Sequence, residues 1–383
     1  MLRFIAGRLT QIVVTFFLFL TVVFVLFQAM PGDYMDKFLM NPRIPPQARE
    51  ALKARLGLTG SVWDQYVHYV GNVLRGNLGV SFDHYPREVW DIIKERLPRT
   101  VVLFLVASVT GFLLGFPLGR SIAWRRGGVW DYTITVTGVL FYTFFTPLLA
   151  LILLFVFSST LGWFRTGGFL TPQLWIDAPV DPQTVFVGLA VTLVAFAAWI
   201  VLTFWVAQRV GRPRPRQLVR WALVLAGLAL AAYGWWYSDV GPHALDIVTH
   251  MVLPVLAVTL IGFGGDMLLM RDSMLEVIRE DYITTARAKG LADRVVRDRH
   301  AARTALLPVV TSFTLSIGFI VSGGIVTETM FSWKGMGLTF VSAVQNQDFP
   351  LAMGCLIFTG ILALTAHLVA DVLYAVLDPR IAY

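Results

Sequence analysis

Charged side chains are scarce in this 383-residue sequence: Asp, Glu, Lys and Arg make up 14% of it, while hydrophobic residues make up 56%. An average soluble domain carries about 25% charged residues. So few charges cannot cover a soluble globular surface of this size. The apolar residues instead fall in runs of about 20, the length that crosses a hydrocarbon core. The composition therefore predicts a protein whose main solvent is the lipid bilayer.

The sequence also lacks the motifs that would let it catalyse a reaction alone. It contains no GxxxxGK[ST] loop to hold nucleotide phosphates, no HExxH zinc motif and no GxSxG nucleophile motif. The single cysteine, Cys355, has no partner for a disulfide, and the six histidines are scattered without metal-ligand spacing. We therefore predict no enzyme, no metal and no cofactor in this chain, so that any energy from ATP comes from a partner.

Eight segments have the length and polarity of transmembrane helices. An isolated strand in lipid would leave its backbone unpaired, and these runs lack the alternating pattern of barrel strands. The predicted fold class is therefore an all-α membrane protein, a polytopic bundle of about eight transmembrane helices. The expected spans are residues 12–30, 101–119, 133–158, 185–207, 218–237, 251–270, 309–330 and 351–377.

Basic residues in the connections between spans predict the orientation of the chain. With the N-terminus inside, 19 Lys and Arg fall on the inner side and only Arg165 and Lys334 fall on the outer side. The segment 31–100 is left out of this comparison because the positive-inside rule governs short loops. Both termini are therefore expected in the cytoplasm, and the net charge of +7 reflects topology rather than nucleic-acid binding.

The extracytoplasmic loop 31–100 is expected to contain two short helices. Prolines 45 and 46 open the first, 47–56, and Gly57 closes it. In the second, apolar residues recur at helical spacing and form one face. This face either packs as a cap on the outer ends of the spans or contacts a docking partner. It comprises Trp63, Tyr66, Val67, Val70 and Leu74.

The longest cytoplasmic connection, within 271–308, is expected to fold as helix, break, helix. Helix formers fill 273–288, Gly290 supplies the break, and Asp293 can cap a second helix. Small side chains around the break would let a short helix end enter a groove on a partner. A DNA-binding helix-turn-helix is disfavoured because the segment is tied to spans at both ends and carries acidic residues. The small residues are Ala286, Ala288 and Gly290, flanked by Arg287 and Lys289.

This connection resembles the cytoplasmic signature loop of the permease family of dipeptide, oligopeptide and nickel ABC importers. Thr284 replaces the acidic first residue of the general signature, although the TARAKG form is typical of the peptide subgroup. The likeness covers most of the chain. The matching loop positions are Thr284, Thr285, Ala286, Gly290, Leu307 and Pro308, and the other similar stretches are PGD at 31–33, GNLGVSF at 76–82, 328–350 and 373–381.

The resemblance implies one permease subunit of an ATP-driven importer in the bacterial or archaeal cytoplasmic membrane. Its partners would be a second permease, identical or homologous, two cytoplasmic ABC ATPases and an extracytoplasmic solute-binding protein. The translocation path would run between the two permeases. The family imports peptides, nickel and, in some organisms, oligosaccharides, so these substrates stay open. The ATPase-coupling loop would be Thr284, Thr285, Ala286, Arg287, Ala288, Lys289, Gly290 and Leu291.

One region departs from the six-span pattern of the resembling family. Residues 171–245 hold two extra spans. Because their number is even, the later segments keep the same side of the membrane, and we interpret the insertion as a peripheral helical hairpin or a docking module. The expected organisation is 1–30 with the first span, the loop 31–100, the second and third spans in 101–170, the hairpin 171–245 and the permease core 246–383.

Ionisable residues inside the expected spans keep a second class of function open. Asp266 and Glu328 are candidates for lining the translocation path, because charged groups in lipid are costly and often functional. His367 and Asp371 also lie in an expected span. A proton-coupled secondary transporter would use such groups, but it often shows related halves, and no convincing internal repeat is present. A membrane scaffold without transport activity is the other alternative.

Overall fold

The structure, a computed structural model, describes residues 2–29, 61–209, 213–320 and 324–377. Helices dominate these ranges, and no strand occurs within them apart from one isolated bridge between Val80 and Glu88. The all-α fold class is therefore confirmed. The expected helix 47–56 and the PGD stretch at 31–33 lie outside the described residues.

Two compact units divide the chain, and each is described by itself. Unit 1 comprises Met1–Leu153 and Pro254–Tyr383, and unit 2 is Leu154–Leu253. The helices of unit 1 are α1 (Leu2–Gln28), α4 (Val62–Leu74), α5 (Val89–Trp124), α6 (Val129–Thr143), α7 (Thr146–Leu153), most of α10 (Gly241–Val277), α11 (Asp281–Ala288), α12 (Asp293–Val295), the π-helical η3 (Val296–Ala301), α13 (Ala302–Ile320), α14 (Ile325–Met330), α15 (Met336–Gln345) and α16 (Phe349–Leu377).

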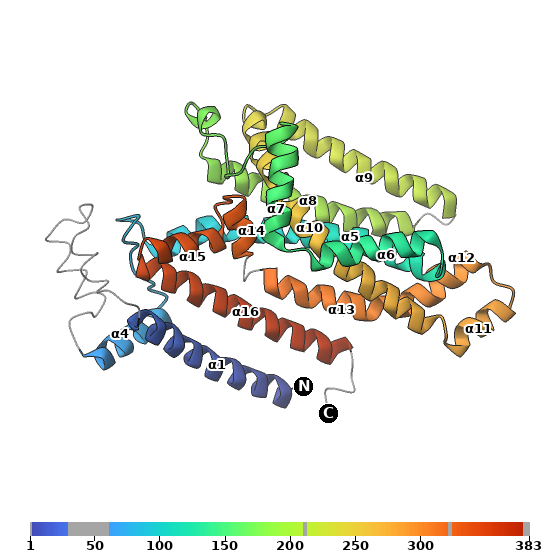
Figure 1. The fold of residues 1–383 in the computed structure, drawn as a ribbon, viewed down its shortest axis with the longest axis horizontal. Helices are drawn as coiled ribbons and strands as arrows, with labels where there is room; N and C mark the ends of the chain where they lie inside the picture. Colours follow the sequence, from blue (N-terminus) through green and yellow to red (C-terminus); the bar gives the residue numbers. More distant parts are fainter. Residues whose placement is uncertain (1, 30–60, 210–212, 321–323, 378–383) are drawn as a thin grey trace. The chain divides into compact units, whose positions relative to one another are not determined.

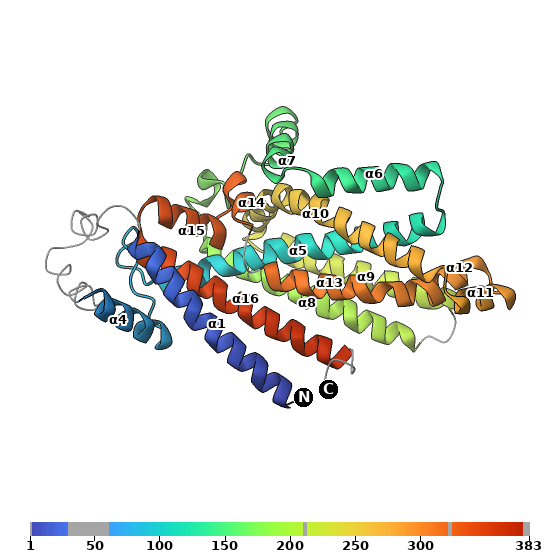
Figure 2. The same cartoon turned by 60° about the horizontal axis from the view of Figure 1, so that its bottom comes forward.

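Within unit 1, long helices lie side by side and short helices gather at their two ends. Helix α16 packs against α1 and α13, and α13 packs against α5 (Figure 1). Figure 2 shows the same neighbours from a second side, with α11 and α12 at one end of the unit and α4 and α15 at the other. The beginning of α1 and the last described turn of α16 lie toward the α11 end in both views.

Helices cover all eight expected spans, although two spans differ from the prediction. Five helices of the described chain are long and apolar enough to cross a membrane, and α6 with the helix after it gives a sixth candidate if a bent pair counts as one span. The third expected span, 133–158, is wrong as a single helix because it bends by 104° between Thr143 and Thr146. Pro147 explains the break, since proline has no N–H and favours the first turn of a new helix.

The seventh expected span, 309–330, is also not one continuous helix in the described chain. Helix α13 ends at Ile320, and the six-residue α14 begins after Gly324. Gly324, the residue before α14, has non-helical backbone angles, and glycine disfavours a helix interior by about 1 kcal/mol relative to alanine. Glu328 therefore lies in a separate short helix.

Three glycines on one face of α5 allow α10 to approach closely. Gly111, Gly115 and Gly119 are four residues apart, so they line up along the helix. A Cβ atom at Gly115 would lie 2.8 Å from the carbonyl oxygen of Phe263 and 2.9 Å from Cβ of Asp266. Small residues at such spacing let membrane helices pack backbone to backbone. Replacing Gly115 by a larger residue would therefore force α5 and α10 apart.

The core at the α4 end joins α1, α5, α15 and α16. Phe27, Val89, Ile93 and Leu351 are buried there, and so is the single cysteine, Cys355. Close van der Waals packing of these side chains stabilises the contact between the first and last helices. Cys355 thus has an ordinary role as a small core residue.

Unit 2 contains the π-helical η1 (Leu154–Thr160), η2 (Pro172–Trp175), α8 (Pro182–Gln208), α9 (Pro213–Trp236) and the first turns of α10. Helices α8 and α9 form the hairpin expected within 171–245. Two indole N–H groups donate across it, from Trp199 to the carbonyl of Leu223 at 2.8 Å and from Trp235 to the hydroxyl of Thr192 at 3.2 Å. These bonds satisfy polar groups that would otherwise be exposed to lipid.

Candidate functional site

The short helix α11 lies where the sequence predicts a coupling loop, but its boundaries differ from the prediction. The expected helix 273–288 is wrong as one helix: α10 runs to Val277, and α11 begins at Asp281 after Glu280 adopts an extended conformation. Because of this break, the side chain of Ile283 lies in a buried cluster with Met274, Val296 and other residues of α10, η3 and α13. This burial overrides the helix propensity of the intervening residues.

The predicted break at Gly290 is confirmed, whereas the predicted cap at Asp293 is not. Gly290 has a φ of +73°, a left-handed conformation that glycine adopts readily. Ala292 is the N-cap of α12 and makes no side-chain cap, and Asp293 is the first helical residue. A carboxylate in the first helical turn is still favourable beside the positive end of the helix dipole.

Helix α11 has one buried face and one exposed face. Ile283 is 0% exposed and Ala286 is 6% exposed, and both pack inside unit 1. Ala286 was expected to meet a partner, but the structure turns its side chain inward because it lies one turn after Ile283 on the same face. The exposed residues of the predicted loop are Thr284, Thr285, Arg287, Ala288, Lys289, Gly290 and Leu291.

Two contacts fix α11 to the long helices. The hydroxyl of Tyr282 donates to the hydroxyl of Thr304 on α13 at 3.1 Å. The guanidinium of Arg287 lies 5.0 Å from the ring centre of Trp124, the last residue of α5. A cation over an indole face is attracted by about 0.5–1 kcal/mol at an exposed site. A displacement of α11 would therefore break or shift its contacts with both α5 and α13.

Ion pairs connect the neighbouring segments to the same helices. Asp298 on η3 accepts from Arg297 at 2.7 and 3.1 Å, and Arg120 of α5 lies 3.5 Å away. The hydrogen bond from Arg297 lowers the pKa of Asp298 below its ordinary value, with Arg120 adding to the shift. Near the end of α10, Arg271 donates two bonds to Asp131 of α6, at 2.9 and 3.3 Å.

At the other end of unit 1, Glu328 is a fully enclosed carboxyl group. It accepts from the hydroxyl of Thr100 on α5 at 2.6 Å and from the backbone N–H of Leu338 at 3.0 Å. The same Thr100 hydroxyl accepts from the N–H of Met336 at 2.7 Å. Glu328 is 0% exposed, and its contacts link α5, α14 and α15.

Asp348 makes a second buried link, which the sequence analysis missed. Its carboxylate accepts from the hydroxyl of Ser81, from the N–H of Phe82 at 3.0 Å, from that of Asp83 at 3.1 Å and from that of Leu351 at 3.3 Å. The last bond caps the start of α16. Asp348 thereby joins two stretches that resemble the permease family, 76–82 and 328–350. Their shared resemblance was the feature of the sequence that could have indicated a contact between them.

Asp266, the other candidate for the path, lies on α10 against the glycine face of α5. Its side chain is half-buried, and no hydrogen bond or ion pair of it occurs among the described residues. His367 on α16 is exposed, and its ring Nδ1 lies 2.9 Å from the carbonyl oxygen of Ala363. The side chain of Asp371 lies outside the described residues. Asp266 is thus placed at a helix contact, apart from Glu328.

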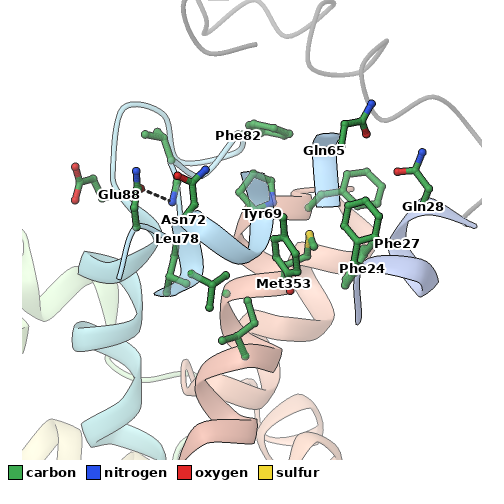
Figure 3. Close-up of a pocket in the computed structure, with 18 residues that line it drawn as sticks. Phe24, Phe27, Gln28, Gln65, Tyr69, Asn72, Leu78, Phe82, Glu88 and Met353 are labelled. Carbon is green, nitrogen blue, oxygen red and sulfur yellow. Dashed lines mark hydrogen bonds between the residues drawn. The ribbon is translucent and has the colours of Figure 1, made fainter. Parts of the chain in front are cut away.

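A pocket of about 120 Å³ opens between the end of α1, the inner side of α4 and the beginning of α16 (Figure 3). Aromatic residues, including Phe24, Phe27, Tyr69 and Phe349, share its wall with aliphatic residues and with polar side chains such as that of Glu88. No Lys, Arg or His is among its described lining residues, so the pocket offers no cation to a peptide carboxylate. Elsewhere too, the described chain holds no group of three side chains suited to a metal ion.

These features define a class of protein, a polytopic helical membrane subunit with a short exposed helix at one end. Comparison with known protein families gives the assignment. The family described as "Binding-protein-dependent transport system inner membrane component" matches residues 115–383, and its N-terminal companion matches residues 1–104. The chain belongs to this family of inner-membrane permease subunits of binding-protein-dependent transport systems.

Individual relatives match along almost their entire length. The "Di/tripeptide transport system permease protein DppB" of Pseudomonas aeruginosa is 32% identical, covering 100% of this chain and 99% of the relative. The "Dipeptide transport system permease protein DppB" of Escherichia coli is 30% identical with the same coverage. The "Oligopeptide transport system permease protein AppB" of Bacillus subtilis is 30% identical, covering 94% of this chain and 93% of the relative. The relatives are named as permeases rather than as enzymes.

Proposed function

We propose that the chain is the permease subunit of an ATP-driven importer of peptides. The printed names of relatives that match it from end to end support peptides over nickel or oligosaccharides. The chain would form half of the translocation path beside a second permease, identical or homologous. An extracytoplasmic binding protein would deliver the peptide, and two partner ATPases would supply the ATPase activity.

The exposed face of α11 carries the coupling part of this proposal. Seven of the eight residues of the signature segment 284–291 are exposed, while Ile283 and Ala286 hold the helix to unit 1. The contacts of Tyr282 and Arg287 tie this helix to α13 and α5. An ATPase that binds the exposed face could therefore move two long helices through one short one.

We infer that α11 and both chain termini lie on the cytoplasmic side. The 19-to-2 distribution of Lys and Arg in the connections supports this orientation. The beginning of α1 and the last described turn of α16 point toward the side of unit 1 that carries α11, which is consistent with it (Figures 1 and 2). Cysteines introduced at Arg214 and Lys289 would then react only with cytoplasmic reagents.

Within the path, Asp266 is the candidate that the geometry favours. It is half-buried without an ion-pair partner in the described chain, whereas Glu328 is enclosed by its own contacts. The hairpin 171–245 is proposed to be peripheral, because it falls within the separate compact unit Leu154–Leu253. Its deletion should leave ATPase binding intact.

The decisive experiment replaces an exposed small residue of α11 by a large one. Ala288 lies on the side of α11 opposite to Ala286, so Ala288→Trp leaves the buried face intact. A bulky group in a packed interface forces displacement or strain. We expect Ala288→Trp to reduce recovery of the ATPases in a pull-down and to abolish peptide uptake, with the protein still inserted in the membrane.

The matched control is Lys334→Trp, an exposed position beside Glu328 at the other end of unit 1. It should leave ATPase recovery unchanged. If Ala288→Trp retains the ATPases and transports peptide normally, α11 is not the coupling element. Uptake that persists without any ATPase would favour a proton-coupled secondary transporter instead.

A further inference from the structure

Helix α4 carries an apolar stripe that the described part of the chain leaves uncovered. Trp63, Val67 and Leu74 are 69%, 52% and 60% exposed. With Val70, they follow each other at intervals of four, three and four residues, so they share one side of the helix. The sequence left open whether this side caps the spans or contacts a partner. In the structure Trp63, Val67 and Leu74 face away from the described residues, whereas Tyr66 of the same predicted face packs against α1.

The neighbouring side of α4 packs against α1. The hydroxyls of Tyr66 and Thr21 lie 2.7 Å apart. The ring centres of Tyr66 and Tyr69 lie 5.4 and 5.6 Å from that of Phe24. Figure 3 shows Tyr69 and Phe24 on facing elements at the pocket. Helix α4 is therefore held against the side of α1.

These contacts fix the depth of α4 relative to the first span. The part of α1 that is long and apolar enough to cross a membrane is Gly7–Gln28. Phe24 lies four residues before its end and Thr21 lies seven, which is roughly 6 and 10 Å at 1.5 Å per residue. Helix α4 thus lies beside the last two turns of the span rather than beyond its end.

Residues of α1 next to this contact are exposed and apolar. Leu18 and Val25 lie one turn before and after Thr21 on the same side, and they are 66% and 55% exposed. In a membrane span such residues contact acyl chains. The stripe on α4 continues this surface at the same depth.

The remaining exposed side of α4 is polar. Asp64, His68 and Arg75 lie on it, about 60–120° around the helix from Val67 or Leu74 at 100° per residue. Asp64 also forms a capping box with Ser61, which fixes the start of the helix. A helix with one apolar and one polar exposed side is suited to the boundary between acyl chains and headgroups.

We propose that α4 is embedded in the membrane interface and that Trp63, Val67 and Leu74 contact the acyl chains of the leaflet at that end of α1. The ligand of this surface is the lipid itself. Its depth beside α1 favours lipid over a soluble partner protein, which would approach from the aqueous side.

The test measures collision rates of nitroxide labels in the assembled transporter, reconstituted in phospholipid vesicles. Labels are attached to Val67→Cys and Leu74→Cys, with His68→Cys as the control on the polar side. The background variant is Cys355→Ala; because Cys355 is 2% exposed, the native background serves equally if that variant is unstable. Oxygen partitions into acyl chains, whereas a nickel chelate stays in water.

We expect labels at positions 67 and 74 to collide several-fold more often with oxygen than with the nickel chelate, and the label at position 68 to show the reverse. Two results would overturn the proposal. Higher access to the nickel chelate at position 67 would place the stripe in water. Exclusion of both reagents at positions 67 and 74 would show that protein covers the stripe, as in a docking surface for a partner.

Discussion

The two ends of unit 1 are held together by different chemistry. At the α11 end, Asp298 and Arg120 are paired while their side chains remain 29% and 27% exposed. At the opposite end, Glu328 and Asp348 are 0% and 1% exposed, and hydroxyl and backbone N–H groups donate to them. Breaking a buried hydrogen bond costs much more than losing an exposed ion pair. The Glu328 junction is therefore expected to resist displacement more strongly than the contact between Asp298 and Arg120, although Arg271 and the mostly buried Asp131 also pair near the α11 end.

A single helix connects these two junctions. Helix α5 carries Thr100, the partner of Glu328, and Arg120, the partner of Asp298. The two residues are 20 positions apart, which corresponds to about 30 Å along a helix. In the proposed importer, a displacement of α11 would move the end of α5 near Arg120, while the buried bonds at Thr100 would hold its other end in place. Substitutions at the Glu328 end should mainly lower the free energy of unfolding, and substitutions at the α11 end should mainly lower peptide uptake.

The largest expected effect is that of Glu328→Ala. The N–H of Leu338 would lose its buried acceptor, and Thr100 would lose the group to which it donates. Because buried donors left without an acceptor are costly, we expect the free energy of unfolding to fall by about 3 kcal/mol. Thermal unfolding of the purified complex in detergent would measure it. Glu276→Ala, which changes an exposed glutamate, is the control, and equal midpoints for both variants would refute the structural role of Glu328.

A somewhat smaller loss is expected for Asp348→Ala. The change removes the cap of α16 and releases Ser81 and the N–H groups of Phe82 and Asp83. We expect a cost of about 2 kcal/mol, measured in the same unfolding experiment. Asp348→Asn keeps one carbonyl acceptor and should recover part of the loss. An asparagine variant no more stable than the alanine variant would show that these hydrogen bonds contribute little.

The sequence predicted the class of fold well because lipid imposes a simple rule. Runs of about 20 apolar residues mark spans, and five helices of the described chain meet that criterion. The bend of the third span was readable from Pro147, and the break of the coupling loop was predicted from Gly290, whose φ is +73°. Both residues act locally, through their own backbone, so no tertiary information is needed to interpret them.

The side-chain partners could not be predicted in the same way. Thr100 and Glu328 are separated by 228 residues, and Ser81 and Asp348 by 267. Only the fold brings such pairs together. The inward orientation of Ala286 depends on how α11 packs on η3 and α13, which an eight-residue helix does not determine by itself. The close approach of α5 and α10 was signalled by the spacing of Gly111, Gly115 and Gly119, but was not recognised.

Substitution of Gly290, at the break after α11, is expected to lower stability only locally. Gly290 has a left-handed backbone, yet a Cβ atom added there would meet no other atom within 4 Å. Gly290→Ala should therefore cost about 1–2 kcal/mol through backbone strain alone. Asparagine tolerates this conformation better, so Gly290→Asn should cost less. Hydrogen exchange of the segment 281–291 would measure both, and an alanine variant with unchanged exchange would contradict the strained backbone.

The smallest effect on stability is expected for Asp298→Ala at the α11 end. Loss of the partly exposed ion pairs should change the free energy of unfolding by less than about 1 kcal/mol. Peptide uptake should nevertheless fall, because η3 is no longer tied to α5 through Arg120. Glu276→Ala, which changes an exposed carboxylate of α10, should leave both quantities unchanged. A large loss of stability for Asp298→Ala would remove the contrast between the two ends.

The central claim is that the α11 end moves with the ATPases while the Glu328 end stays fixed. Hydrogen–deuterium exchange of the permease with and without its ATPase partners tests it most directly. We expect increased protection of residues 281–291 in the complex and unchanged exchange at 328–338. Unchanged exchange at 281–291, or a change confined to 328–338, would contradict it.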